Sequence, residues 1–361
     1  MNFWPLGFYV LRAFFLFVDF FIKIWYNINR KKQKVVTMAN IIITNVCNLQ
    51  CEYCFASSIT AQEQKYIQID DFYQILGFLN QSPNQRIGLI GGEPCVHPKF
   101  EILLSILNGF CEKTGNAAII FSNGVFLAPY IDQLGMVDVL VNCNSPESQG
   151  QLNYQKLLDS LQIAYEQGMI ARDQVRCGCN IHLNQDNYDY FWHDIVDKFE
   201  AKIVRCSVAA PGGCYQKEWQ HQNKKEEYYS QLKPKIIQFI KEADKRNVKI
   251  AFDCNQVPIC FFSNEERELV AKTALTFPQL NCTPSVDIDT NLNAFSCFGS
   301  QGESIPISEF NTIEELERYL FIKNTIPKIQ LNGEAMCGNC NLYKKYQCQG
   351  GCLSFANKET L

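Results

Sequence analysis

The stretch Cys47-Asn48-Leu49-Gln50-Cys51-Glu52-Tyr53-Cys54-Phe55 decides the fold of this chain, and it comes just after the apolar run Ile41-Ile42-Ile43-Thr44. The apolar run predicts a strand, so the three cysteines lie in the loop that leaves this strand. Three thiolates at these spacings can bind one face of a four-iron cluster. One iron of such a cluster is left without a protein ligand and can bind a small molecule.

The bulk composition narrows the class of protein. The chain has 361 residues, 47% of them hydrophobic, which suits one large domain with a smaller one beside it. The net charge is −4, with 33 basic and 37 acidic residues. Because no basic field extends over the chain, nucleic acid is not an expected partner.

Cysteine is unusually frequent, with 18 residues. Disulfide frameworks are the alternative to metal binding, but they belong mainly to short secreted chains. The first 37 residues contain no evident small-residue cleavage site for export. We therefore expect reduced thiols, metal ligation and a cytoplasmic location.

Residues 3–26 are apolar and long enough to span a bilayer if they are helical. Arg12, Asp19 and Lys23 interrupt them at spacings that place the three charges on one narrow helical face. We expect an amphipathic helix on the inner membrane surface, followed by a basic linker at 30–34. A transmembrane span and an upstream extension of the catalytic domain are the alternatives.

Strand and helix patterns alternate from residue 39 onward. The expected strands are 40–44, 86–90, 117–122, 137–142, 175–181 and 202–208. The expected helices are 70–79, 99–110, 130–134, 152–167 and 188–199. Six such units predict an α/β fold, an open partial (β/α)6 TIM-type barrel whose site lies at the C-terminal strand ends.

A long charged helix (224–246) and a further strand (248–252) follow, and then a cysteine-rich region. We therefore expect three parts: an N-terminal helix with its linker (1–37), the barrel (38–250) and a small cysteine-rich domain (251–361).

The motif Gly91-Gly92-Glu93-Pro94 directly follows the second predicted strand. Paired glycines let the backbone approach a ligand closely, and a glutamate can accept hydrogen bonds from an ammonium group. Alone, the motif also fits a plain turn. Its place one strand–helix unit after the cysteine loop favours a ligand site.

Polar residues also end the next two strands. Ser122 and Asn123 end the third strand, and Asn142 and Asn144 follow the fourth. Because parallel strands end at one edge of a sheet, these groups are expected to line one pocket. Capping of turns by Asn and Ser is the alternative.

The order CNLQCEYC, GGEP, SNG resembles the radical S-adenosylmethionine (radical SAM) enzymes, over roughly residues 39–250. The resemblance implies that Cys47, Cys51 and Cys54 hold a [4Fe–4S] cluster whose open iron binds the amino and carboxylate groups of SAM. It also implies that this bound SAM is cleaved reductively to a 5′-deoxyadenosyl radical, which abstracts hydrogen from a substrate.

The same resemblance implies the SAM pocket. Its expected residues are Gly91, Gly92, Glu93 and Pro94 at the methionyl amine, Ser122 and Asn123 on the wall, Asn142 or Asn144 at the ribose, Asn180 at the adenosyl group, and Arg205 with Ser207 at the carboxylate. A structural ion pair is the alternative for Arg205. No catalytic base is required, although His97 and His182 lie near strand ends; a packed histidine is the simpler interpretation for each.

The C-terminal cysteines resemble the SPASM extension of radical SAM enzymes, which carries auxiliary [4Fe–4S] clusters. The resemblance implies that Cys282, Cys297 and Cys352 share one cluster and that Cys337, Cys340 and Cys348 share another. The spacing of seven residues between Cys340 and Cys348, Leu292 at an expected glycine position and the missing final cysteine depart from the pattern.

Two upstream thiols, Cys254 and Cys260, can complete the two ligand sets, and the sequence leaves open which thiol joins which set. A zinc site is the alternative. The remaining thiols are expected to be ordinary buried side chains: Cys95, Cys111, Cys143, Cys177, Cys179, Cys206 and Cys214.

The resemblance implies a peptide- or protein-modifying enzyme that receives electrons from an external donor such as flavodoxin or ferredoxin. A radical SAM enzyme acting on a small molecule or a lipid is the first alternative. An iron–sulfur electron carrier without turnover is the second.

Overall fold

The computed structural model describes residues 38–54, 56, 64–81, 86–211, 219, 224–254, 257–275, 281–300, 304–332, 337–345 and 347–356. The predictions for the helix at 3–26 and the basic linker lie outside the described residues. Among the residues that are described, no helix is both long enough and apolar enough to cross a membrane.

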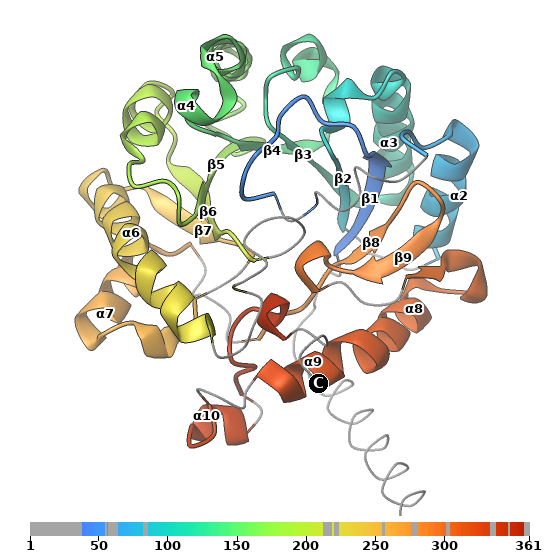
Figure 1. Cartoon of the computed structure of the whole chain (residues 1–361). Helices are drawn as coiled ribbons and strands as arrows, with labels where there is room; N and C mark the ends of the chain where they lie inside the picture. The colour runs from blue at the N-terminus through green and yellow to red at the C-terminus, as the bar shows by residue number, and fades with distance from the viewer. Residues whose placement is uncertain are drawn as a thin grey trace, which may run out of the picture. The chain divides into compact units, whose positions relative to one another are not determined.

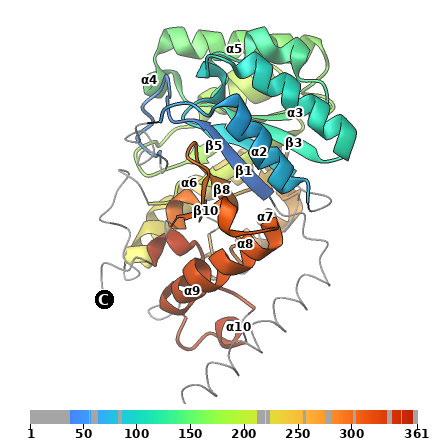
Figure 2. The same cartoon turned by 90° about the vertical axis from the view of Figure 1, so that its right-hand side faces the viewer.

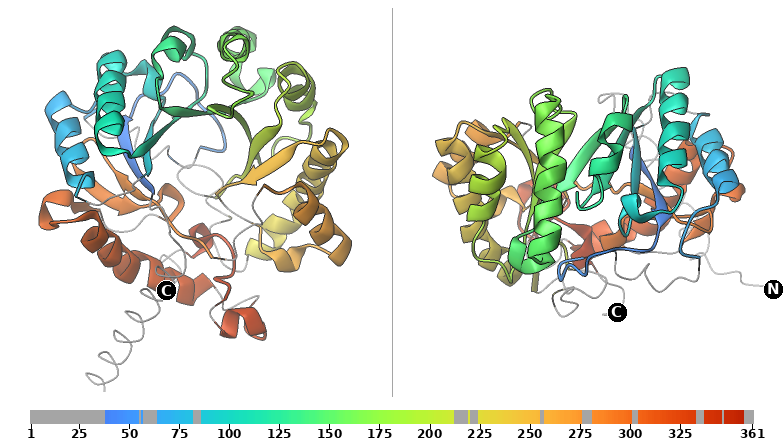
Figure 3. Two further views of the ribbon diagram at one scale, coloured as in Figure 1. Left: turned by 180° about the vertical axis from the view of Figure 1, so that it is seen from behind. Right: turned by 90° about the horizontal axis from the view of Figure 1, so that it is seen from above.

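All seven strands expected up to residue 252 are confirmed, and they pair side by side in a parallel sheet. They are β1 (Met38–Thr44), β2 (Arg86–Gly91), β3 (Ala117–Ser122), β4 (Asp138–Asn142), β5 (Val175–Ile181), β6 (Ile203–Val208) and β7 (Lys249–Phe252). Helices α2 (Ile69–Leu79), α3 (Phe100–Thr114), α5 (Gln151–Glu166) and α6 (Lys225–Lys245) cover the outer face of the curved sheet (Figure 1, Figure 3).

Three helix predictions need correction. The helix expected at 99–110 continues to Thr114, because Cys111 still faces the core and Gly115 ends the helix in the left-handed conformation (φ 73°). The segment 130–134 lies in a 3-10 helix, Ala128–Gln133, that begins with a proline in its first turn. The segment 188–199 contains a π-helical stretch, Phe191–Asp197, instead of an α-helix.

The cysteine-rich region contributes further strands to the same sheet, which the sequence did not predict. Strand β8 (Val286–Ile288) pairs in parallel with β1, and β9 (Asn293–Ser296) and β10 (Ile305–Pro306) extend this edge (Figure 2). Across the junction, Asn40 Nδ2 donates to the buried carboxylate of Asp287 at 2.6 Å. The boundary expected near residue 250 stays a prediction.

Helices α4 (Pro146–Gln149), α7 (Asn264–Thr273), α8 (Ile313–Leu320), α9 (Ile326–Asn332) and α10 (Asn341–Lys344) complete the described elements that carry an α label.

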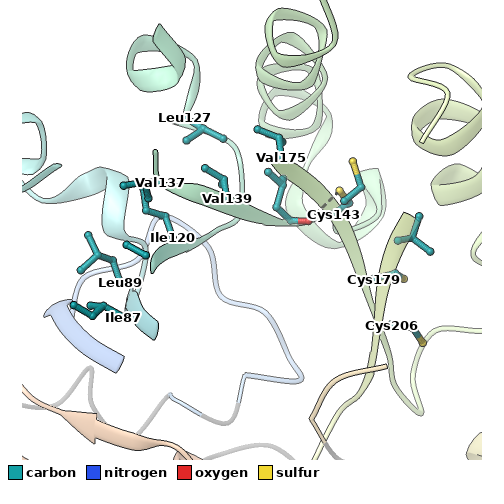
Figure 4. Close-up of a cluster of buried hydrophobic side chains, with 14 of the residues drawn as sticks. Ile87, Leu89, Ile120, Leu127, Val137, Val139, Cys143, Val175, Cys179 and Cys206 are labelled. Atoms are coloured by element: carbon teal, nitrogen blue, oxygen red, sulfur yellow. Dashed lines mark hydrogen bonds between the residues drawn. The ribbon is translucent and has the colours of Figure 1, made fainter. Parts of the chain in front are cut away.

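The core between the sheet and its helices contains thiols as well as aliphatic side chains. Cys143, Cys179 and Cys206 lie among valine, leucine and isoleucine side chains (Figure 4). Cys95, Cys111 and Cys177 are buried as well. The prediction of ordinary buried thiols is therefore confirmed for these six, and Cys214 lies outside the described residues.

The end of β2 packs directly on the start of the cysteine loop. Gly92 N donates to Thr44 O at 2.8 Å, and Glu93 N donates to Val46 O at 2.9 Å. A Cβ on Gly91 would overlap the Thr44 carbonyl, and one on Gly92 would overlap the Val46 carbonyl and lie 2.8 Å from Cys47 N. The two glycines thus allow the cysteine loop itself to approach β2.

This packing predicts the effect of adding one methyl group. Gly92→Ala should lower the free energy of unfolding by about 1–3 kcal/mol, because backbone atoms must move to make room. Gly109→Ala, in α3 with open space around it, is the matched control and should stabilise by about 0.5–1 kcal/mol. Urea unfolding of both variants measures the difference, and equal stability of the two would contradict the prediction.

The Asn40–Asp287 pair predicts a pH dependence. Burial raises the pKa of Asp287 to about 6 from an ordinary 3.8, although hydrogen bonds from Asn40 and Ser285 lower it. Ionisation of Asp287 therefore lowers the free energy of unfolding by about 3 kcal/mol above pH 6. This penalty disappears as the pH falls toward 4.

Asp287→Asn removes this charge and keeps an acceptor oxygen for Asn40 and Ser285. The variant should be more stable than the wild-type chain near pH 7, and the gap should close on acidification. Unfolding curves across this pH range test it; a gap that does not change with pH would refute the assignment to Asp287.

Candidate functional site

The three cysteines of the first loop lie together beyond the end of β1. All three are half-buried. Burial raises the pKa of Cys47 to about 11, and burial followed by the Cys54 and Cys47 thiolates raises the pKa of Cys51 to about 12. Leu49 N donates to Cys47 Sγ and Asn144 Nδ2 donates to Cys51 Sγ, both at 3.4 Å.

This donor set fits an iron–sulfur cluster. The sulfurs are close enough to repel each other as thiolates, and N–H groups already point at two of them. Hydrogen bonds to sulfur are a usual means of stabilising the negative charge of such a cluster.

Glu93 joins the ends of β2 and β3. Its carboxylate is buried and accepts hydrogen bonds from Ser122 Oγ (2.8 Å) and from the backbone N–H groups of Asn123 (2.7 Å) and Cys95 (3.2 Å). Burial raises the pKa of Glu93, and these donors oppose the rise. Asn123 Nδ2 then donates to Asn48 Oδ1 at 2.9 Å. Glu93, Ser122 and Asn123 are thus brought together and tied to the cysteine loop.

A second group of predicted residues forms a hydrogen-bonded chain across the ends of β4, β5 and β6. Asn142 Nδ2 donates to Tyr53 OH (2.6 Å), and Asn180 Nδ2 donates to Asn142 Oδ1 (2.9 Å). Tyr53 OH also donates to Asn144 Oδ1. This chain connects Asn142, Asn144 and Asn180 to the cysteine loop through Tyr53, which the sequence analysis did not single out although it lies inside the motif.

The chain continues to Arg205 and Ser207, which both donate to Asn180 Oδ1. Arg205 Nε also forms an ion pair with Asp253 Oδ2 at 3.0 Å. Arg205 therefore forms the structural ion pair that was the alternative interpretation, and its role at a SAM carboxylate stays a prediction. Asp253 was missed because a lone aspartate after a short strand carries no signal.

The two histidines take different positions. His97 Nε2 lies 3.2 Å from Ile67 O, and His97 Nδ1 accepts from Lys99 N at 3.0 Å, so both ring nitrogens serve local structure. His182 packs against Tyr53, with 4.9 Å between ring centroids, and its Nε2 lies 3.1 Å from Gln185 Oε1. Burial lowers the pKa of both.

The C-terminal thiols divide into two sets by their electrostatic interactions. The pKa of Cys254 is raised by the Asp253 carboxylate, by burial and by the thiolates of Cys297 and Cys282. The pKa of Cys282 is raised by burial and by the thiolates of Cys352 and Cys297. We call Cys254, Cys282, Cys297 and Cys352 the first cysteine set.

The pKa of Cys260 is raised by burial and then by the thiolates of Cys348 and Cys340. The pKa of Cys337 is raised by burial and by the thiolates of Cys348, Cys260 and Cys340, while the Lys225 ammonium opposes the rise. We call Cys260, Cys337, Cys340 and Cys348 the second cysteine set. Within the described residues, no three His, Cys, Asp or Glu side chains are placed to hold a single metal ion.

A family model described as a 4Fe-4S single cluster domain matches residues 38–163. GTP 3′,8-cyclase of Synechocystis sp. is 30% identical over 102 residues, which cover 28% of this chain and 30% of the relative. The radical SAM cyclopropyl synthase TigE of Paramaledivibacter caminithermalis is 25% identical over 185 residues, covering 44% of this chain and 37% of the relative. The chain thus matches about a third of the length of these two proteins.

Two solved structures share the fold over most of the chain. The structure of anSMEcpe with bound AdoMet has a TM-score of 0.58 at 14% identity, covering 88% of this chain and 86% of that one. Streptococcus suis SuiB bound to its precursor peptide SuiA has a TM-score of 0.51 at 15% identity, covering 88% and 70%. The chain shares the partial-barrel fold of these structures, and its three-cysteine loop, the cluster-domain match and the sequence relatives make it similar to radical SAM enzymes.

Proposed function

We propose that this enzyme abstracts hydrogen from a side chain of a peptide or protein and that the product is oxidised with help from auxiliary clusters. When bound, the [4Fe–4S] cluster and SAM supply a 5′-deoxyadenosyl radical through one-electron cleavage of a carbon–sulfur bond. The observation that carries the proposal is the packing of β2 and its Glu93 directly on the three-cysteine loop.

The chain's own residues hold this site in a fixed shape. Cys47, Cys51 and Cys54 bind the cluster, and the backbone at Gly91, Gly92 and Pro94 approaches the methionyl amine. Glu93 holds Ser122 and Asn123 beside it through hydrogen bonds of 2.7 and 2.8 Å. Asn142, Asn144 and Asn180 face the ribose and adenosyl groups with amides already ordered by Tyr53 and Arg205. Such preorganisation keeps the reacting atoms within contact distance.

The two cysteine sets supply four thiols each, the number that an auxiliary [4Fe–4S] cluster needs. We infer that Cys254 completes the first set and that Cys260 completes the second. Cys260 would then provide the ligand that the family pattern expects after Cys352. The grouping of Cys254 with Cys282 and Cys297, and of Cys260 with Cys348 and Cys340, supports this assignment.

The peptide substrate is supported by the fold shared with SuiB, which was solved with its precursor peptide. A small-molecule substrate is the second candidate, because the sequence relatives include GTP 3′,8-cyclase and a SAM-dependent nucleotide dehydratase.

The first test is cleavage of SAM. Reconstituted, reduced protein should form 5′-deoxyadenosine, and replacing Cys47, Cys51 and Cys54 together by alanine should reduce its formation by at least about 10³-fold, because no reducible site then contacts SAM. Chromatography of the products measures the rate. Cys111→Ala, at a buried thiol far along α3, is the control and should keep the activity. Anaerobic wild-type protein with intact clusters that cleaves no SAM would also exclude the proposal and leave the electron-carrier alternative.

The second test separates the substrate classes. Short peptides encoded beside the gene should lose hydrogen on incubation with the enzyme and SAM, as seen by mass spectrometry, and nucleoside triphosphates should return unchanged. With a perdeuterated peptide, deuterium should appear in 5′-deoxyadenosine. Conversion of a nucleotide, with no deuterium transfer from any peptide, would support the small-molecule candidate instead.

A further inference from the structure

Lys225, the first residue of α6, is fully buried and carries a positive charge into the C-terminal region. Its ammonium group donates to Asn332 O (2.6 Å), Asn332 Oδ1 (3.0 Å) and Gly350 O (2.8 Å). The N-terminal turn of α6 lies against the red C-terminal segment in Figure 1. All three acceptors are neutral, so hydrogen bonding is satisfied but the charge is not compensated.

A buried ammonium with only neutral acceptors is costly, since its hydration is lost without a counter-ion. No carboxylate of the described residues lies within ion-pair distance of Lys225 Nζ. Other lysines on α6 differ in this respect: Lys233 pairs with Glu266 at 2.8 Å and Lys235 with Asp186 at 2.7 Å. Negative charge from another source would therefore stabilise the ammonium form of Lys225.

The groups that face Lys225 and can become anions are thiols from both cysteine sets. Cys337 interacts most strongly, followed by Cys352, Cys348 and Cys260, so three belong to the second set and one to the first. A Cβ built on Gly350 would lie 3.4 Å from Cys337 Sγ and 3.5 Å from Lys225 Nζ, which places both groups around this glycine. The positive end of the α6 dipole lies at the same place.

We propose that Lys225 is a counter-ion shared by the two cysteine sets, and that it favours the reduced state of the clusters they hold. The proposal rests on the proposed function in requiring those clusters. Reduction adds one electron, here from a dithionite-type or flavodoxin-type one-electron donor, and breaks no bond. The added negative charge is stabilised by a cation that is already in place, which raises the reduction potential. Lys225 is a positioning residue that touches no substrate.

Four variants of the full chain, reconstituted with iron and sulfide, test this role. Lys225→Met removes the charge and the donors, Lys225→Gln removes the charge and keeps a donor, and Lys225→Arg keeps the charge. Lys235→Met is the matched control on the same helix. Redox titration monitored by electron paramagnetic resonance gives the potentials, and a Cys47, Cys51 and Cys54 triple alanine variant identifies the auxiliary signals.

The expected result is a lower potential of at least one auxiliary cluster in Lys225→Met and Lys225→Gln. The equilibrium constant for reduction should fall at least tenfold, which is about 59 mV for one electron. Lys225→Arg and Lys235→Met should stay close to the wild-type value. Unchanged potentials in Lys225→Met, or an equal fall in Lys225→Arg, would overturn the proposal.

A second measurement covers variants that fail to assemble clusters. Lys225→Met loses three hydrogen bonds with or without iron, but it loses the interaction with a cluster only in the iron-loaded protein, so the fall in unfolding temperature should be smaller in the iron-free protein. An equal fall in the two forms would mean that the lysine serves only structural hydrogen bonds, and the proposal would be wrong.

The two proposals can fail separately. Wild-type protein that binds iron only at Cys47, Cys51 and Cys54 would refute the auxiliary clusters, and the role of Lys225 with them, while SAM cleavage persists. Wild-type protein with all clusters and unaltered potentials in the variants would refute the role of Lys225 alone.

Discussion

The approach of two backbones, at the ends of β1 and β2, is the contact on which the site depends. Hydrogen bonds of 2.8 and 2.9 Å fix the cysteine loop to β2 through main-chain atoms, so this contact uses none of the three thiols. Only glycine permits this at positions 91 and 92. The buried carboxylate of the next residue, Glu93, accepts hydrogen bonds from Ser122 and Asn123 at the end of β3. The position of the cysteine loop is therefore fixed relative to β3 as well.

Beyond β3 the site is built mainly from neutral amides and hydroxyls. Asn142, Asn144 and Asn180 are connected through Tyr53, whose pKa is raised well above its ordinary value by burial, so the phenol stays protonated. A side-chain amide can donate to one neighbour and accept from another, so one hydrogen-bonded network can connect the ends of several strands. The charged side chain at the end of this network is Arg205, and it forms an ion pair with Asp253.

The seven parallel strands could be predicted from the alternation of strand and helix patterns, and the polar ends of β1 to β4 because these buried apolar runs end in or precede Gly, Ser or Asn. The edge strands β8 to β10 could not, since they are short and β8 contains the charged Asp287, whose burial depends on Asn40 some 247 positions away. The ligand grouping of Cys254 and Cys260 also depends on tertiary contacts. The burial of Lys225 could not be predicted either, because the sequence of α6 is charged there and the acceptors of Lys225 come from Asn332 and Gly350.

The auxiliary clusters that we propose for the C-terminal region would couple metal binding to folding there. The Asp253 carboxylate and burial raise the pKa of Cys254, and burial raises the pKa values of Cys282 and Cys337, so without metal these thiols are protonated and carry no charge that could offset the ammonium of Lys225. Binding of iron replaces those protons and leaves the sulfurs negative. The same event would thus provide the counter-charge that we propose for Lys225, so a lysine that destabilises the empty domain would stabilise the loaded one.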